Sequence, residues 1–173
     1  MRPLHPSLHL ARIGRPLRAD AAGHELAAAL QHRPDRDDRR ADPAQRRCII
    51  PASGYYEWKP TPTGKQPYYI SARDGSILPF AGLWDEWHDP ESGEQVRSCT
   101  VIVTDANALT RRIHDRMPVI LVGAQQTAWL ASAAAATELL RPAPDEMLQL
   151  WPVSRRVNRA GNENDPKLTE AIH

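Results

Sequence analysis

One twelve-residue run limits the fold more than any other part of the chain. It reads Arg47-Cys48-Ile49-Ile50-Pro51-Ala52-Ser53-Gly54-Tyr55-Tyr56-Glu57-Trp58. A short apolar stretch is closed by a proline, and a turn sequence then leads into an aromatic stretch with strong strand preference. The run therefore predicts two strands with a turn between them. Because side chains alternate along a strand, Glu57 shares a face with Tyr55, while Tyr56 and Trp58 take the other face.

The rest of the chain predicts strands with short connections and few helices. The proline- and glycine-rich segment 60–64 predicts a hairpin between residues 55–59 and 67–71. Further strands are expected at residues 77–87, 97–104 and 117–122, and helical segments at residues 109–113, 127–141 and 145–150. Trp129 is expected in the core, as are Trp58 and Trp84. The pattern predicts an α+β fold whose curved, mostly antiparallel sheet is barrel-like and has a few marginal helices.

Composition divides the chain near residue 45. Residues 1–44 contain none of the ten aromatic residues and are dense in Arg, Asp, Pro and Ala. We expect residues 1–44 to be a divergent, poorly ordered leader, produced by a shifted reading frame or a wrongly placed start. Residues 45–173 are expected to form one domain that is incomplete at its N-terminal end.

Charge and cysteine content limit the partners. Residues 1–47 carry 10 Lys/Arg against 6 Asp/Glu, whereas the remainder carries 12 against 15. A DNA-binding surface in the main domain would therefore be a local arginine groove and not a basic face. No apolar run approaches the ~20 residues needed to cross a bilayer, and no signal sequence is visible, so we expect a cytoplasmic protein. Two cysteines 51 positions apart predict neither a zinc site nor a disulfide, and no cofactor is expected.

Three polar residues are candidates for chemistry. Glu57 interrupts the aromatic stretch, and His114 and Arg116 lie where a helical turn meets a strand. An imidazole titrates near ~6.5 and can move protons at cellular pH. An arginine can hold a phosphate with its planar guanidinium group. Each of the three could instead be an ordinary surface side chain.

Five motifs occur in a fixed order along the chain. They are the Arg47–Trp58 run, Lys65-Gln66-Pro67-Tyr68, Phe80-Ala81-Gly82-Leu83-Trp84, Thr104-Asp105-Ala106-Asn107 and Ile113-His114-Asp115-Arg116-Met117-Pro118-Val119-Ile120-Leu121. Together they resemble the SOS-response-associated peptidase (SRAP) family, the abasic-site processing proteins, over about three quarters of the chain.

The resemblance implies an activity, a partner and site residues. Proteins of this family use an N-terminal cysteine to trap the ring-opened aldehyde of an abasic site in single-stranded DNA, with peptidase-like self-release. The amine forms an imine and the thiol closes it into a thiazolidine. The matching catalytic positions are Glu57 and His114, and Arg116 matches a DNA-facing arginine. The implied protein needs no metal, acts in the SOS response, associates with the nucleoid when bound to DNA, and is expected to be a monomer.

The start of the chain departs from the family pattern. Residue 2 is Arg2, and neither Cys48 nor Cys99 can offer an amine and a thiol from one residue. We therefore expect no stable crosslink, although the Met1 amine could form a transient imine. One alternative is a non-catalytic, single-stranded DNA-binding remnant of the same fold. Another is a thiol protease built on Cys48 and His114.

Overall fold

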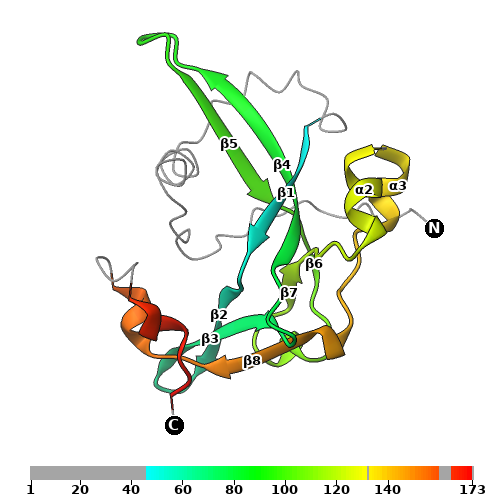
Figure 1. Ribbon diagram of the computed structural model, residues 1–173. Helices are drawn as coiled ribbons and strands as arrows, with labels where there is room; N and C mark the ends of the chain where they lie inside the picture. Colours follow the sequence, from blue (N-terminus) through cyan, green and yellow to red (C-terminus); the bar gives the residue numbers. More distant parts are fainter. Residues whose placement is uncertain (1–45, 132, 160–164, 173) are drawn as a thin grey trace, which may run out of the picture.

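Three small antiparallel sheets carry the fold in the computed structural model, which describes residues 46–131, 133–159 and 165–172 (Figure 1). The first sheet has the order β1-β4-β5 and consists of β1 (Arg47–Ala52), β4 (Leu78–His88) and β5 (Gln95–Val101). The second has the order β2-β3-β8 and consists of β2 (Tyr55–Thr61), β3 (Gly64–Ala72) and β8 (Leu148–Pro152). The third pairs β6 (Val103–Asp105) with β7 (Arg116–Pro118). The expected leader, residues 1–44, lies outside the described residues.

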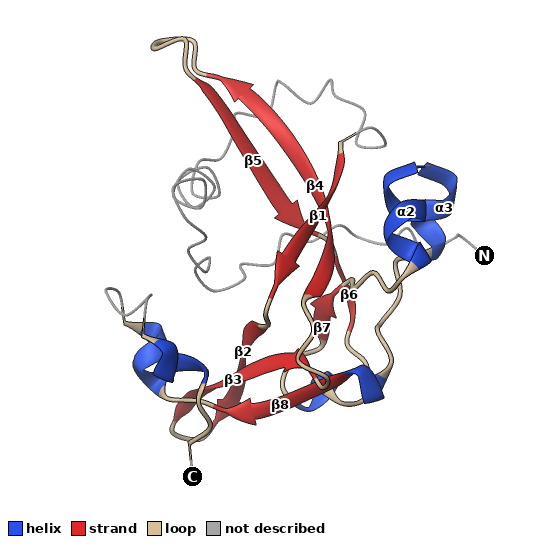
Figure 2. Ribbon diagram, viewed as in Figure 1, coloured by secondary structure: helices blue, strands red, loops and turns tan. Residues whose placement is uncertain are grey.

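Helical segments are short and lie beside the sheets (Figure 2). They are α2 (Ala124–Ala131), α3 (Ala133–Glu138) and the 3₁₀ turns η1 (Thr110–Arg112), η2 (Asp145–Met147), η3 (Arg155–Asn158) and η4 (Pro166–Thr169). None of the helices in the described residues is long and apolar enough to span a bilayer. The predicted α+β class with mostly antiparallel pairing is confirmed.

The expected barrel-like closure is wrong. The described strands form three separate sheets, and at two of the places where the chain passes from one sheet to another it does so by a short irregular step. The first step is at Ser53–Gly54, between β1 and β2. The second is at Ile102, whose backbone N–H donates to Ala81 while its carbonyl accepts from Val119. Ile102 therefore divides the predicted strand at residues 97–104 into β5 and β6.

The hydrophobic core has two parts that meet at β4. Neighbouring β4 residues face opposite ways, so Phe80 enters one cluster and Ala81 the other. The first cluster comprises Tyr55, Ile70, Ala72, Leu78, Phe80, Met117, Ile120, Ala143 and Leu148. The second comprises Ala81, Ile102, Val119, Leu121, Trp129 and Ala136. Trp129 is buried as predicted, and its indole N–H donates to the carbonyl of Cys48 at 2.9 Å.

Two helix predictions need correction. The helix expected at residues 127–141 begins earlier, at Ala124, because Gly123 turns the chain with a φ of 53° and the side chain of Gln125 accepts from the Val122 N–H. Helical structure ends at Glu138. The helix expected at residues 145–150 is only the short η2 turn, and β8 follows it. Pairing with β3 and burial of Leu148 in the core override the weak local helix signal.

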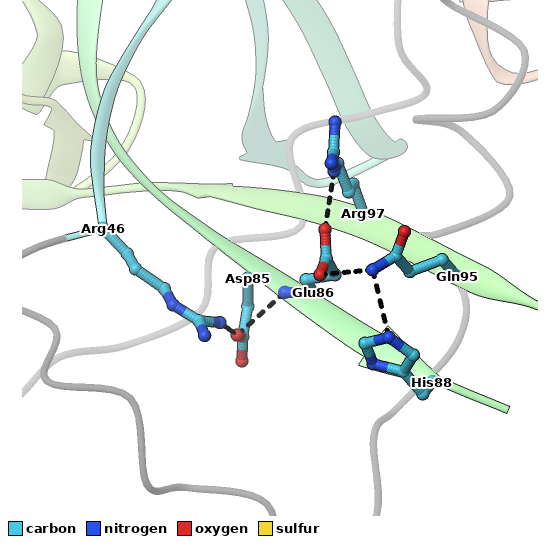
Figure 3. A network of polar contacts seen from close by, with 6 residues as sticks. All are labelled: Arg46, Asp85, Glu86, His88, Gln95 and Arg97. Atoms are coloured by element: carbon cyan, nitrogen blue, oxygen red, sulfur yellow. Dashed lines mark hydrogen bonds and ion pairs between the residues drawn. The ribbon is translucent and has the colours of Figure 1, made fainter. Parts of the chain in front are cut away.

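Strands β4 and β5 continue as a two-stranded ribbon that extends away from the β2-β3-β8 sheet (Figure 1). A polar network holds the ribbon: Glu86 accepts from Arg97 and from Gln95, each at 2.7 Å (Figure 3). The prediction that Trp84 is a core residue is wrong. Trp84 is 38% exposed and lies under the guanidinium group of Arg46. Residues 78–101 carry five Asp/Glu and one Arg, so the surface of this ribbon is acidic and is not the arginine groove that DNA binding would need.

Gly54 allows the step from β1 to β2. A Cβ atom at this position would lie 2.5 Å from the Ile70 carbonyl oxygen and 2.5 Å from the Tyr69 ring. A backbone oxygen in a paired strand cannot move aside cheaply. We therefore expect Gly54→Ala to lower the free energy of unfolding by about 1–3 kcal/mol, the usual cost of overpacking. A thermal melt that matches the unsubstituted protein would contradict this prediction.

Candidate active site

Glu57 projects from β2 at the edge of the first core cluster. Its cross-strand neighbour on β3 is Tyr68, and it shares a strand face with the buried Tyr55, as predicted. Tyr56 and Trp58 stand on the other face, where their rings lie 6.5 Å apart. The strand therefore holds a half-buried carboxyl group next to apolar side chains.

Burial raises the pKa of the Glu57 carboxyl above its ordinary value. The positive charges of His114 and Lys65 act in the opposite direction, and the negative charge of Asp115 adds to the rise. A hydrogen bond from the Trp58 backbone also lowers this pKa. Desolvation is the largest of these effects, so Glu57 keeps its proton more readily than a surface glutamate does.

His114 follows η1 and has a side chain that is 45% exposed. Two contacts compete for its Nδ1 atom. The Arg116 backbone N–H donates to Nδ1 at 3.1 Å, and a carboxylate oxygen of Asp115 lies 3.2 Å from the same atom. When Nδ1 accepts from Arg116, the proton of the neutral ring sits on Nε2. When the ring is protonated, Nδ1–H can instead donate to Asp115.

A buried polar network sets the position of the segment before His114. The Asn107 side-chain amide donates to the Ala143 carbonyl at 2.9 Å. Its carbonyl oxygen accepts from both the backbone N–H and the hydroxyl of Thr110, each at 2.9 Å. The Thr110 carbonyl then accepts from the backbone N–H of His114 at 3.0 Å. Asn107 and Thr110 therefore anchor the 3₁₀ turn from which His114 projects.

The structure brings the predicted residues Glu57 and His114 within electrostatic reach of each other, although they are far apart in the sequence. Arg116 opens β7 opposite Asp105 and is half-buried. Its side chain makes no hydrogen bond or ion pair within the described residues, so its guanidinium group has free donors. The catalytic roles of Glu57 and His114 and the DNA-binding role of Arg116 stay predictions.

The two cysteines do not form a reactive centre. Cys48 is half-buried on β1 beside Gly82, and burial, with the neighbouring Cys99, raises the pKa of its thiol to about 11. A nucleophilic cysteine needs a lowered pKa, which a nearby positive charge provides. These facts speak against a thiol protease built on Cys48 and His114. Among the described residues no group of three or more His, Cys, Asp and Glu side chains is placed to hold a metal.

The sequence patterns assign no role to Asn107, Thr110, Lys65 or Tyr55. Tyr55, Lys65 and Asn107 do lie in three of the recognised motifs, so the motif pattern could have identified them. The contacts of these residues form only in the folded chain, where distant segments meet. The hydrogen bond from Asn107 to Ala143 is one example.

Known proteins resemble this chain both in sequence and in three-dimensional structure. A sequence model of the family SOS response associated peptidase (SRAP) matches residues 39–160. The abasic site processing protein YoqW of Bacillus subtilis is 39% identical over 131 residues, which cover 73% of this chain and 58% of YoqW. The abasic site processing protein HMCES of Xenopus tropicalis is 37% identical over 147 residues, which cover 73% of this chain and 44% of HMCES.

A crystal structure of a protein from Bacteroides thetaiotaomicron superposes with a TM-score of 0.69 at 33% identity, covering 76% of this chain and 59% of that one. The chain thus spans less than two thirds of the length of these relatives. The family model nevertheless matches well over half of the chain and includes Glu57, His114 and Arg116. This chain belongs to the SOS response associated peptidase (SRAP) family.

Proposed function

We propose that this chain processes abasic sites in single-stranded DNA as part of the DNA damage response. Relatives named abasic site processing proteins support the substrate. The observation that carries the proposal is the electrostatic interaction of Glu57 with His114, because it joins a carboxyl group inclined to keep its proton with an imidazole. Such a pair suits the chemistry of an aldehyde and an imine.

The proposed chemistry begins at the ring-opened aldehyde of the abasic site. An amine of the protein adds to the aldehyde carbon, and His114 carries the proton that the nitrogen loses to the aldehyde oxygen, which becomes a hydroxyl group. The protonated carboxyl of Glu57 then donates to the departing hydroxyl group, which leaves as water and gives an imine. Hydrolysis of the imine reverses these steps and accounts for self-release. Loss of the DNA 3′ phosphate by β-elimination from the imine would be the lyase activity.

The second candidate is a non-catalytic single-stranded DNA-binding protein of the same fold. The state of Cys48 and Cys99 favours it, because burial raises the pKa of both thiols. Neither thiol belongs to a residue with a free amine, so neither can close a thiazolidine ring. On this reading Arg116 would contact phosphate without any bond being formed or broken.

Incubation of the full chain with single-stranded oligonucleotides tests both candidates. One oligonucleotide contains a single abasic site and the control is intact. We expect borohydride to trap a protein–DNA adduct on the abasic oligonucleotide alone, because borohydride reduces an imine to a stable amine. The non-catalytic protein would be favoured if the chain bound both oligonucleotides equally, lost both at high salt and formed no adduct that borohydride traps.

Arg116 should contribute affinity without sequence selectivity. We expect Arg116→Gln to weaken binding of single-stranded DNA several-fold and to reduce the slope of log affinity against log salt concentration by about one. Arg112→Gln is the control, because Arg112 is exposed and donates to the Leu109 carbonyl within its own turn. Equal losses in the two variants would contradict a specific role for Arg116.

A further inference from the structure

The hydroxyl group of Tyr55 is buried without a hydrogen-bond partner. Tyr55 is 2% exposed, and its ring packs edge-on against Phe80 with ring centroids 5.8 Å apart. Among the residues that the structure describes, no other buried side-chain nitrogen or oxygen lacks a partner. Buried polar groups in folded proteins are nearly always hydrogen-bonded. A phenylalanine would fill the same space without the cost of burying a hydroxyl group, so the hydroxyl calls for an explanation.

The nearest charged group on the same strand face is the carboxyl of Glu57. Tyr55 and Glu57 are two positions apart on β2, which separates their Cα atoms by about 7 Å. Burial raises the pKa of Tyr55 well above its usual range, and the negative charge of Glu57 raises it further. The phenol therefore stays protonated at every physiological pH and can act only as a neutral donor toward a carboxylate.

The groups around the two side chains differ sharply. The Tyr55 ring is surrounded by the apolar first core cluster, including Ile70, Met117 and Leu148. The charged groups near the Glu57 carboxyl are His114, Asp115 and Lys65, all of which are exposed. Tyr55 is thus the donor on the buried side of this carboxyl, while the charged groups approach from the solvent side.

We propose that the Tyr55 hydroxyl and the Glu57 carboxyl share one ordered water molecule, through which Tyr55 positions Glu57 and stabilises its ionised form. A water needs two or more polar partners, and it bridges groups that are too far apart for a direct hydrogen bond. The inference rests on the proposed function of Glu57. A general acid has to release its proton as well as hold it, and a fixed donor on the carboxylate favours that release.

A carbon-13 NMR titration of the Glu57 carboxyl in the full chain tests the proposal, with Glu57→Gln used to assign the signal. We expect Tyr55→Phe to raise the midpoint of the titration by about one pH unit, a tenfold increase in proton affinity. Tyr56→Phe is the matched control, because it removes a hydroxyl from the adjacent residue on the opposite strand face. Its midpoint should equal that of the unsubstituted protein.

An unchanged midpoint in Tyr55→Phe would overturn the proposal, as would equal shifts in the two variants. The titration uses no DNA, so its result is independent of whether the chain processes abasic sites. The trapping assay supplies the functional part: Tyr55→Phe should move the pH dependence of adduct formation upward by the same interval. A hydroxyl with a purely structural role would leave both the titration and the pH dependence unmoved.

Discussion

Glu57→Gln should slow the proposed abasic-site reaction by about 10²–10⁴-fold, the range for loss of a general acid. A glutamine side chain occupies nearly the same volume and keeps a polar group at the position. It cannot donate a proton to the departing hydroxyl group. Binding of the abasic oligonucleotide should change little, because the substitution removes no positive charge. The rate of formation of the borohydride-trapped adduct, measured with protein in excess, gives the comparison directly.

The same substitution should stabilise the fold at pH values above the raised pKa of Glu57. The pKa of Glu57 is raised in the folded state, so the folded protein binds this proton more tightly than the unfolded chain does. The contribution of Glu57 to stability is therefore fully present below its ordinary pKa and is lost as pH rises through the raised value. Above the raised pKa the half-buried carboxylate disfavours folding, and Glu57→Gln removes it. A thermal melt at several pH values should show the gain only on the alkaline side.

Glu86→Gln is the matched control. Glu86 also lies on a strand, but Arg97 holds the pKa of this carboxyl below its ordinary value, and it lies in the ribbon network of Figure 3. We expect Glu86→Gln to keep full activity and to gain no stability at alkaline pH. If Glu57→Gln lost activity no more than Glu86→Gln did, Glu57 would not be the acid. If Glu57→Gln lost activity and stability together, its carboxylate would be a structural group.

The sequence could predict the parts of the fold in which the interacting residues lie close together along the chain. The β2-β3 hairpin was predictable because its turn and both strands lie within eighteen residues. Strand β8 was not, because its partner β3 precedes it by about eighty positions and its own sequence begins with a helix-like pattern. The division at Ile102 likewise follows from hydrogen bonds to Ala81 and Val119, which no local pattern encodes.

The candidate site likewise has residues that the sequence could identify and residues that it could not. Glu57 and His114 could be named as candidates because Glu57 interrupts an aromatic stretch, His114 lies where a helical turn meets a strand, and both match family motif positions. The groups around them could not be assigned roles, because Lys65 acts on Glu57, and Glu57 on Tyr55, only once β2 and β3 have paired and the core has closed. The exposure of Trp84 was missed for the opposite reason: an aromatic residue in a strand usually packs inward, but Trp84 lies where β4 pairs with β5 and is exposed.

Asn107→Ala should lower the free energy of unfolding by about 2–4 kcal/mol. Asn107 is 8% exposed, and its side chain makes three buried hydrogen bonds to Ala143 and Thr110. An alanine leaves the Ala143 carbonyl and both Thr110 donors without these partners, and each unsatisfied buried group costs about 1–3 kcal/mol. Chemical denaturation at equilibrium should show the change as a lower midpoint with an unchanged slope.

The network also leads to an expectation about activity, because Thr110 holds the backbone of His114. Well below its melting temperature, Asn107→Ala should form the trapped adduct at least tenfold more slowly while it binds the abasic oligonucleotide almost normally. Such a split between rate and affinity indicates a displaced imidazole and not a loss of folded protein. Asn158→Ala is the matched control, since exposed Asn158 accepts one hydrogen bond, from Trp58 at 2.8 Å, far along the sequence from His114. If both variants lost the same stability and neither changed the rate, Asn107 would be an ordinary core residue, and the position of His114 would depend on other contacts.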